Sequence, residues 1–260
     1  MIKYYDTHSH LNMEEYQDEL NDCIKNLEIN NTFTNCVGCD LKSSIKAVEL
    51  ANRYPNLMKA CVGIHPNEVE NYLNDDLIFK KLDELIAKNR NSIVAIGEIG
   101  LDFYYSDKFK KEQEIFCNKQ IELGMKYNLP IMFHLRNAFE EIKPTIEKYK
   151  NIKKLIHCFS SNLNEASFYL SKDCYISIPG IVTFKNAISL QEAVKEIDIN
   201  KLVVETDSPY LTPVPFRGKK NYPHYVKHTV EFIAKIKKLE ILEVEKKVLQ
   251  NAKEFFSVDF

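Results

Sequence analysis

Residues 93–96 read Ile-Val-Ala-Ile, an unbroken apolar run that leads directly into Gly97 and Glu98. Residues 131–133, Ile-Met-Phe, form a second run of the same kind. Apolar runs without polar alternation are typical of parallel strands that helices cover on both faces. The chain is therefore expected to alternate strands with helices around a parallel sheet.

The same alternation recurs along the whole chain. Eight strands are expected, at residues 4–10, 33–39, 58–66, 93–101, 130–135, 154–159, 174–181 and 202–206. Amphipathic segments that predict helices lie at residues 14–27, 43–53, 76–88, 109–127, 138–149, 164–170 and 186–197, and two more helices, around residues 226–233 and 244–255, close the chain. From His8 to Asp207 each strand-to-strand step takes about 28 residues, the size of a βα unit.

This spacing predicts one domain over residues 1–260, an α/β fold with the parallel eight-stranded TIM (β/α)8 barrel and its site at the carboxyl ends of the strands. The alternative is an open doubly wound sheet, which usually has a glycine-rich first turn. Here the first strand ends in His8-Ser9-His10 instead. The long connection over residues 208–223 has four prolines and is expected to be functional.

Composition narrows the functional classes. The 35 basic and 37 acidic side chains give a net charge of −2, which excludes a polycationic nucleic-acid coat and leaves only local contacts with nucleic acid. No apolar run reaches the ~18 residues of a membrane span, so we expect a cytoplasmic protein without a membrane partner. The odd number of cysteines, seven, indicates reduced thiols rather than a disulfide framework.

Ionisable side chains follow the expected strands where each strand ends. They are His8, His10, His65, Glu98, His134, His157 and Asp207. The carboxyl ends of the strands of a parallel barrel meet on one face, where active sites lie. Imidazole favours zinc, and carboxylate allows manganese or magnesium to compete. We therefore expect two divalent metal ions (Zn, Mg, Mn or similar) on this face.

Strand order assigns the ligands. His8, His10 and Asp207 are expected to hold one ion and His134 and His157 the other, with Glu98 as the bridge between them. His65 is expected to be catalytic, through a hydrogen bond to the substrate or to a ligand. Glu205 is two residues before Asp207 and is expected to support a ligand, to add a metal contact or to lie against the substrate.

Several motifs occur in a fixed order. They are Asp6-Thr7-His8-Ser9-His10-Leu11, Gly63-Ile64-His65-Pro66, Gly97-Glu98-Ile99-Gly100-Leu101-Asp102, His157-Cys158-Phe159-Ser160, Glu205-Thr206-Asp207-Ser208-Pro209 and Arg217-Gly218-Lys219-Lys220-Asn221. Together they resemble the TatD-family deoxyribonucleases, from residue 4 to about residue 225. The resemblance implies a TIM-type barrel that hydrolyses DNA phosphodiester bonds with divalent metal. It implies as ligands the same six residues that strand order assigns.

The chain departs from the family pattern in three motifs. Ser161 follows Ser160 where the family usually has glycine, and Asn67 stands where a second histidine is frequent. The fifth motif commonly reads His-Ser-Arg-Glu, where this chain has His134-Leu135-Arg136-Asn137. No ligand is lost. We expect these changes to affect substrate positioning and rate.

Basic residues near the strand ends indicate how a charged substrate is held. Arg136, Arg217 and Lys219, together with Lys220, are expected to bind phosphate groups of DNA single strands or ends, with Glu98 and Asp207 acting on the reacting groups. Asp207 is expected to accept the proton of the attacking water. We expect an exonuclease that acts as a monomer.

Two other classes of function stay open at this point. One is an amidohydrolase or deacylase that acts on a small molecule or an aminoacyl-tRNA ester, and the other is a non-catalytic module that binds metal and nucleic acid. Many amidohydrolases bridge their metals with a carboxylated lysine, whereas here Glu98 takes the bridging place. The aromatic residues Phe103, Tyr104 and Tyr105 could stack on bases or pack at the rim.

Overall fold

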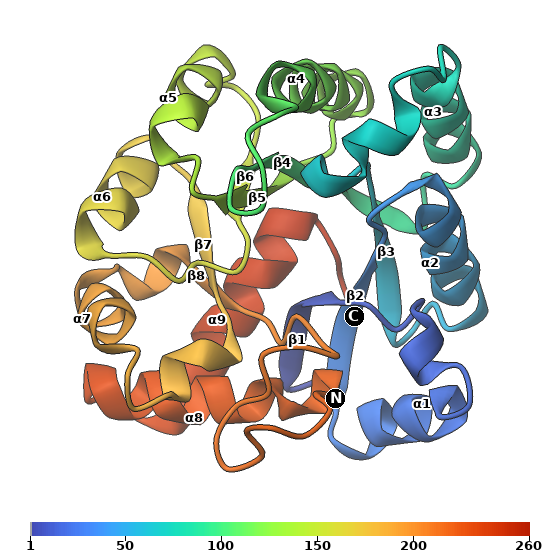
Figure 1. Cartoon of the computed structure of the whole chain (residues 1–260). Coiled ribbons are helices and arrows are strands. Elements are labelled where there is room, and N and C mark those ends of the chain that lie inside the picture. The colour runs from blue at the N-terminus through green and yellow to red at the C-terminus, as the bar shows by residue number, and fades with distance from the viewer. Residues whose placement is uncertain (1) are drawn as a thin grey trace.

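The computed structural model describes residues 2–260, and in these residues eight parallel strands form one sheet in the order of the sequence. The strands are β1 Tyr4–Ser9, β2 Thr32–Val37, β3 Met58–Val62, β4 Ile93–Asp102, β5 Ile131–Arg136, β6 Lys154–Ile156, β7 Tyr175–Ile178 and β8 Leu202–Val204. An isolated parallel bridge joins Ser9, at the end of β1, to Ser208 in the segment that follows β8, so that the barrel is nearly closed (Figure 1). The predicted (β/α)8 barrel is confirmed.

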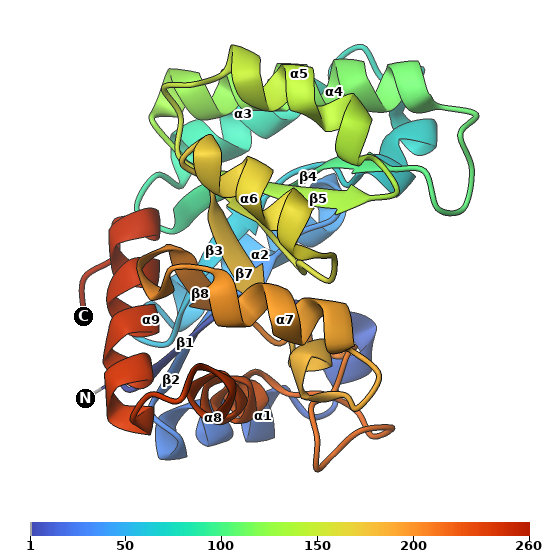
Figure 2. The same cartoon turned by 90° about the vertical axis from the view of Figure 1, so that its left-hand side faces the viewer.

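Helices surround the sheet, and one of them lies across its end. The helices of the described residues are α1 Leu20–Ile29, α2 Leu41–Arg53, α3 Ile78–Lys88, α4 Lys110–Tyr127, α5 Phe139–Lys148, α6 Leu163–Ser171, α7 Ile188–Glu196, α8 Val226–Lys237 and α9 Ile241–Phe256. Figures 1 and 2 show α1 to α8 arranged around the strands, with α9 at the end where the two chain termini lie. None of the helices described is long and apolar enough to cross a membrane.

The start of the first expected helix is wrong. Residues Glu14–Tyr16 form a 3-10 turn, and α1 begins only at Leu20. The side chain of Tyr16 is buried, and its hydroxyl donates a hydrogen bond of 2.6 Å to the carbonyl oxygen of Asn221. Packing against the loop over residues 208–223 therefore takes this segment out of the helix that its pattern predicts.

The hydrophobic core has an outer and an inner part. The larger cluster joins the outward faces of the strands to the buried faces of the helices. A smaller cluster joins Tyr5, Phe33 and Met132 of the strands to Phe255 and Phe256 of α9, with the rings of Tyr5 and Phe33 4.9 Å apart. Because α9 closes the amino-terminal end of the barrel, the carboxyl ends of the strands are left for the polar residues.

The outer layer provides a test of packing on one helix. Ile121 of α4 is 0% exposed, and Ile115 of the same helix is 52% exposed. We expect Ile121→Ala to lower the free energy of unfolding by about 2–5 kcal/mol, because it leaves a cavity between α4 and the strands. The matched variant Ile115→Ala is expected to change it by less than about 0.5 kcal/mol. Urea unfolding of both variants measures the difference, and equal losses would contradict this packing.

Candidate metal centre

Four side chains converge where the ends of β1, β4 and β8 meet. The Nε2 atom of His8 lies 3.1 Å from Nε2 of His10, 3.4 Å from Oε2 of Glu98 and 3.6 Å from Oδ1 of Asp207. Nε2 of His10 lies 3.8 Å from the same oxygen of Glu98 and 3.4 Å from that of Asp207. Four ligands arranged tetrahedrally at about 2.1 Å from a metal ion are about 3.4 Å apart. These four donor atoms therefore fit one small divalent cation.

The second oxygen of Glu98 faces a different set of imidazoles. Its Oε1 atom lies 2.7 Å from Nδ1 of His134, 3.2 Å from Nε2 of His157 and 3.4 Å from Nε2 of His65. The rings of His157 and His8 stack with their centroids 3.8 Å apart, which brings the two sets into contact. The structure thus brings all six predicted ligands together, with the two oxygens of Glu98 facing the two sets.

The ionisation of these groups suits a cation. Burial opposes the charge of Glu98, but the field of His65 and His157 and hydrogen bonds from His134 and His157 outweigh it and hold its pKa well below the ordinary value. Burial, and then His157, lowers the pKa of His8, which keeps that imidazole neutral and its lone pair available. The chemistry of the donor set, nitrogen and carboxylate oxygen, fits zinc and its neighbours.

The acidic groups around His157 also favour a positive charge. Burial lowers the pKa of His157, but the carboxylates of Glu205 and Glu98 outweigh burial and raise it well above the ordinary value. In the absence of a metal ion the carboxylates thus draw a proton onto this imidazole. A divalent cation replaces such protons when it binds, because metal ligands must be deprotonated.

Two imidazoles have an oxygen behind them, next to the ring nitrogen that faces away from the centre. Nδ1 of His10 lies at hydrogen-bond distance, 3.0 Å, from the carbonyl oxygen of Val37. Nδ1 of His157 lies 3.1 Å from Oε1 of Glu205, an ion-pair distance without hydrogen-bond geometry. Such partners fix the tautomer and the orientation of a metal-binding histidine. Glu205 is 0% exposed, so the expected support of a ligand fits its position and the expected contact with substrate does not.

Asp102 is a residue of the site to which sequence reasoning gave no role. Its Oδ2 atom lies 3.0 Å from Nε2 of His134 and accepts a hydrogen bond of 3.1 Å from the amide of Asn67. A carboxylate behind a histidine is the usual support for a metal ligand. The sequence could have identified Asp102 as a residue of the site, because it ends the motif that starts at Gly97 and directly follows an expected strand. Asn67 thus takes part in the site as a neutral donor.

His65 has a different arrangement from the other histidines. Its Nδ1 atom accepts a hydrogen bond of 3.1 Å from the backbone N–H of Asn67 at the start of the 3-10 helix Pro66–Tyr72. A neutral imidazole that accepts at Nδ1 carries its proton at Nε2. Nε2 of His65 therefore carries a proton that points towards Oε1 of Glu98, and its catalytic role stays a prediction.

Of the residues expected to bind phosphate, three lie beside aromatic rings and one is engaged in an ion pair. Arg136 has its guanidinium 3.5 Å from the ring centroid of Tyr104, and the guanidinium of Arg217 lies 4.2 Å from that of Phe184. Lys219 has its ammonium 5.9 Å from the ring of Phe216. Lys220 instead pairs with Glu19 at 3.1 Å and is committed to holding the loop against the barrel.

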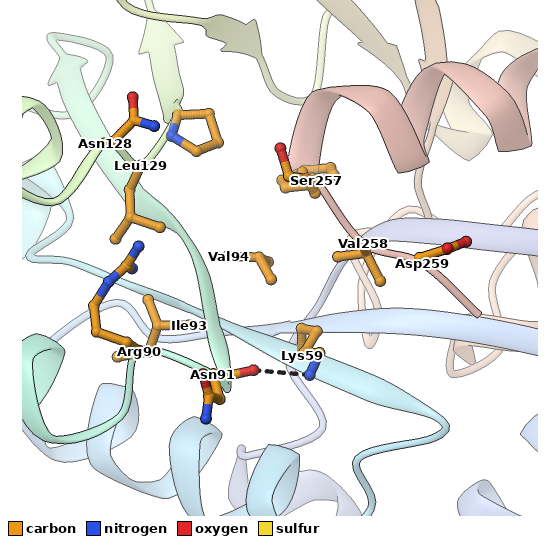
Figure 3. A pocket seen from close by; sticks show the side chains of 12 residues that line it. Lys59, Arg90, Asn91, Ile93, Val94, Asn128, Leu129, Ser257, Val258 and Asp259 are labelled. Carbon is orange, nitrogen blue, oxygen red and sulfur yellow. Dashed lines mark hydrogen bonds between the residues drawn. The ribbon is translucent and has the colours of Figure 1, made fainter.

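Two cavities lie at opposite ends of the barrel. An open cavity of about 520 Å³ lies among the loops that follow β1, β2 and β8, and its lining includes Glu14, Asp40, Lys42, Lys46 and Tyr210. A second, of about 320 Å³, lies at the amino-terminal end of the strands between β3, β4 and the end of the chain (Figure 3). There Lys59 donates to the carbonyl oxygen of Asn91, and that end of a barrel contributes stability rather than catalysis.

A barrel whose carboxyl-terminal face gathers histidines and carboxylates in this way belongs to the class of metal-dependent hydrolases. The model of the family of TatD-related DNases matches residues 5–257. An uncharacterized metal-dependent hydrolase of Mycoplasma genitalium is 45% identical, over 98% of this chain and 99% of the relative. The chain belongs to the TatD family and is a metal-dependent hydrolase.

Other relatives agree with this assignment. The uncharacterized metal-dependent hydrolase YabD of Bacillus subtilis is 37% identical, over 98% of this chain and 99% of the relative. The crystal structure of YJJV, a TatD homologue of Escherichia coli, superposes with a TM-score of 0.93 at 21% identity and covers 99% of both chains. A TatD-family hydrolase of Entamoeba histolytica gives a TM-score of 0.88 at 23% identity, over 98% of both chains. These likenesses between structures show the shared fold.

We expect Glu98→Gln to weaken divalent metal binding by more than about 100-fold. The amide removes the negative charge and puts an N–H₂ donor where one set of imidazoles needs an oxygen, so its effect exceeds the 10- to 100-fold typical of supporting residues. Calorimetric titration with Zn²⁺ and Mn²⁺ measures the affinity. Glu49→Gln, an exposed change on α2, is the matched control. A Glu98→Gln variant that binds ions like the unchanged protein would contradict the bridging position of Glu98.

A second prediction concerns Asp102. Asp102→Asn is expected to weaken metal binding by about 10- to 100-fold, because the amide has a single acceptor oxygen and cannot accept both from His134 and Asn67 on one side and from the backbone N–H of Tyr104 on the other. The control is Asp107→Asn, which neutralises an exposed carboxylate in the loop that follows β4. The same titrations measure both variants, and an Asp102→Asn protein with unchanged affinity would show that His134 needs no support from this carboxylate.

Proposed function

We propose that the protein hydrolyses phosphodiester bonds of DNA, from an end of the strand, with two divalent ions such as Zn²⁺, Mg²⁺ or Mn²⁺. The observation that carries this proposal is the orientation of the Glu98 carboxylate, whose two oxygens face two different sets of imidazoles. His8, His10 and Asp207 would hold one ion with Oε2, and His134 and His157 the other with Oε1. Ions bound there would lower the pKa of a water molecule towards neutrality and screen the charge of the phosphate.

Asp207 is the group that accepts a proton in this proposal. Burial opposes its charge, but a hydrogen bond from His10 and the field of the imidazoles outweigh burial and lower its pKa, so that it is ionised at neutral pH. Its Oδ1 atom faces His8 and His10, and within residues 2–260 its Oδ2 atom has only the thiol of Cys158 as a hydrogen-bond partner, at 4.0 Å. The side chain is 15% exposed, which leaves Oδ2 within reach of solvent and substrate.

His65 and the basic residues act on the phosphate. His65 donates from Nε2 beside Glu98, which suits a phosphate oxygen that carries negative charge. Arg136 lies two residues after His134 in β5, and because side chains of a strand alternate, both lie on the same face. Arg136 would therefore meet a phosphate at the rim of the centre, with Arg217 and Lys219 on the loop over residues 208–223 holding the strand further out.

Two features favour a phosphodiester over a cyclic amide. Glu98 takes the bridging place that a carboxylated lysine has in many amidohydrolases, and no lysine occurs in β5, Ile131–Arg136. Cationic groups are available around the centre for an anionic substrate. Hydrolysis of cyclic amides or of aminoacyl-tRNA esters by a protein that leaves DNA intact would make the substrate class wrong.

The decisive variant is Asp207→Asn. We expect it to lower kcat on a single-stranded oligonucleotide by a factor of at least roughly 10³ in the presence of Mg²⁺ or Mn²⁺, because the amide cannot accept a proton. Chelation is expected to abolish the activity of the unchanged protein, since the charge screening is lost. The rate of release of terminal nucleotides measures both effects.

The controls separate an enzyme from a module that only binds. Asp76→Asn neutralises an exposed carboxylate and should keep full activity. Affinity for the oligonucleotide, measured by fluorescence anisotropy with the Asp207→Asn protein, should stay close to that of the unchanged protein. Binding of DNA without turnover by the unchanged protein, with any divalent ion, would favour the non-catalytic module instead.

A further inference from the structure

An exposed aromatic pair lies at the rim of the metal centre. Tyr104 and Tyr105 follow β4 in the loop that leads to α4, and they are 54% and 73% exposed. Their rings are nearly perpendicular, with centroids 4.9 Å apart. The guanidinium of Arg136 lies 3.5 Å from the centroid of Tyr104 and 5.1 Å from that of Tyr105. Figure 2 shows that this loop projects beyond the ends of β4 and β5.

One carboxylate attaches this aromatic pair to the metal centre. Oδ1 of Asp102 accepts a hydrogen bond of 3.0 Å from the backbone N–H of Tyr104, while Oδ2 of the same residue lies 3.0 Å from Nε2 of His134. Asp102 also pairs in register with Arg136 across β4 and β5. The position of the tyrosines is therefore fixed relative to a predicted metal ligand.

Arg136 differs from the lysines of the same rim. Lys108 pairs with Glu70 at 3.4 Å, and Lys110 pairs with Glu141 at 3.6 Å. Within residues 2–260 no carboxylate lies at ion-pair distance from Arg136, so its charge is held by aromatic rings and its N–H groups are available to an anion. A tyrosine pair with a free guanidinium thus offers flat faces and a positive charge side by side.

We propose that Tyr104, Tyr105 and Arg136 form a stacking site for an unpaired nucleobase next to the phosphate that is cleaved. The proposal rests on the proposed function and narrows its substrate to a single strand or a frayed end, because a base inside a duplex has its faces covered. Aromatic side chains stack on any base, since every base has a flat π face. The site therefore favours unpaired strands without selecting a sequence.

The test compares two changes of one tyrosine on two substrates. Tyr105→Ala is expected to raise KM for a single-stranded oligonucleotide by about 5- to 150-fold, the range that loss of one stacked base gives. Tyr105→Phe keeps a stacking face and is expected to stay within about twofold of the unchanged protein. Oligonucleotides with one abasic nucleotide, placed at successive positions from the end, locate the base concerned. At that position the loss caused by Tyr105→Ala should disappear.

The outcomes distinguish this proposal from the one on which it rests. Leu242→Ala, which removes an exposed apolar side chain from α9, controls for general effects of a surface change. An equal loss with Tyr105→Ala on intact and abasic strands, or no loss on either, overturns the stacking site while the nuclease stands. If the unchanged protein hydrolyses neither the oligonucleotide nor methyl p-nitrophenyl phosphate, a diester without a base, the proposed function itself is overturned.

Discussion

The two carboxylate oxygens of Glu98 face two different groups of imidazoles, and the other polar residues of the site surround this carboxylate. Its side chain is almost fully buried, so its charge has to be balanced by neighbours rather than by water. On one side the neighbours are His8 and His10, and on the other His134, His157 and His65. A buried carboxylate among so many imidazoles is stable only with protons or cations between them, which is why the donor set points to metal.

The barrel explains how residues so far apart in the chain reach this carboxylate. Parallel strands deliver their ends to one face, and α9 closes the opposite end with Phe255 and Phe256. Support for the ligands then comes from the next residues out: Val37 behind His10, Glu205 behind His157 and Asp102 behind His134. Asp102 also holds the backbone of Tyr104, so the proposed substrate site and the metal centre share one carboxylate.

Sequence reasoning could predict the barrel and the convergence of the six ligands because both follow from period and position. The unbroken run Ile93–Ile96 predicts a parallel strand. Because the carboxyl ends of parallel strands meet on one face of the barrel, a histidine at such an end is expected on that face. Sequence reasoning could not predict which side chains in loops distant in sequence form ion pairs or hydrogen bonds with one another. Lys220 pairs with Glu19, and Tyr16 hydrogen bonds to Asn221, through contacts between segments about 200 residues apart in sequence that no local pattern encodes.

Anomalous X-ray diffraction from crystals of the unchanged protein grown with Mn²⁺ tests the central claim most directly. The account predicts two anomalous peaks, one against Oε2 of Glu98 among His8, His10 and Asp207, and the other against Oε1 among His134 and His157. A map without a peak beside Glu98, or with metal bound only elsewhere on the molecule, would contradict it.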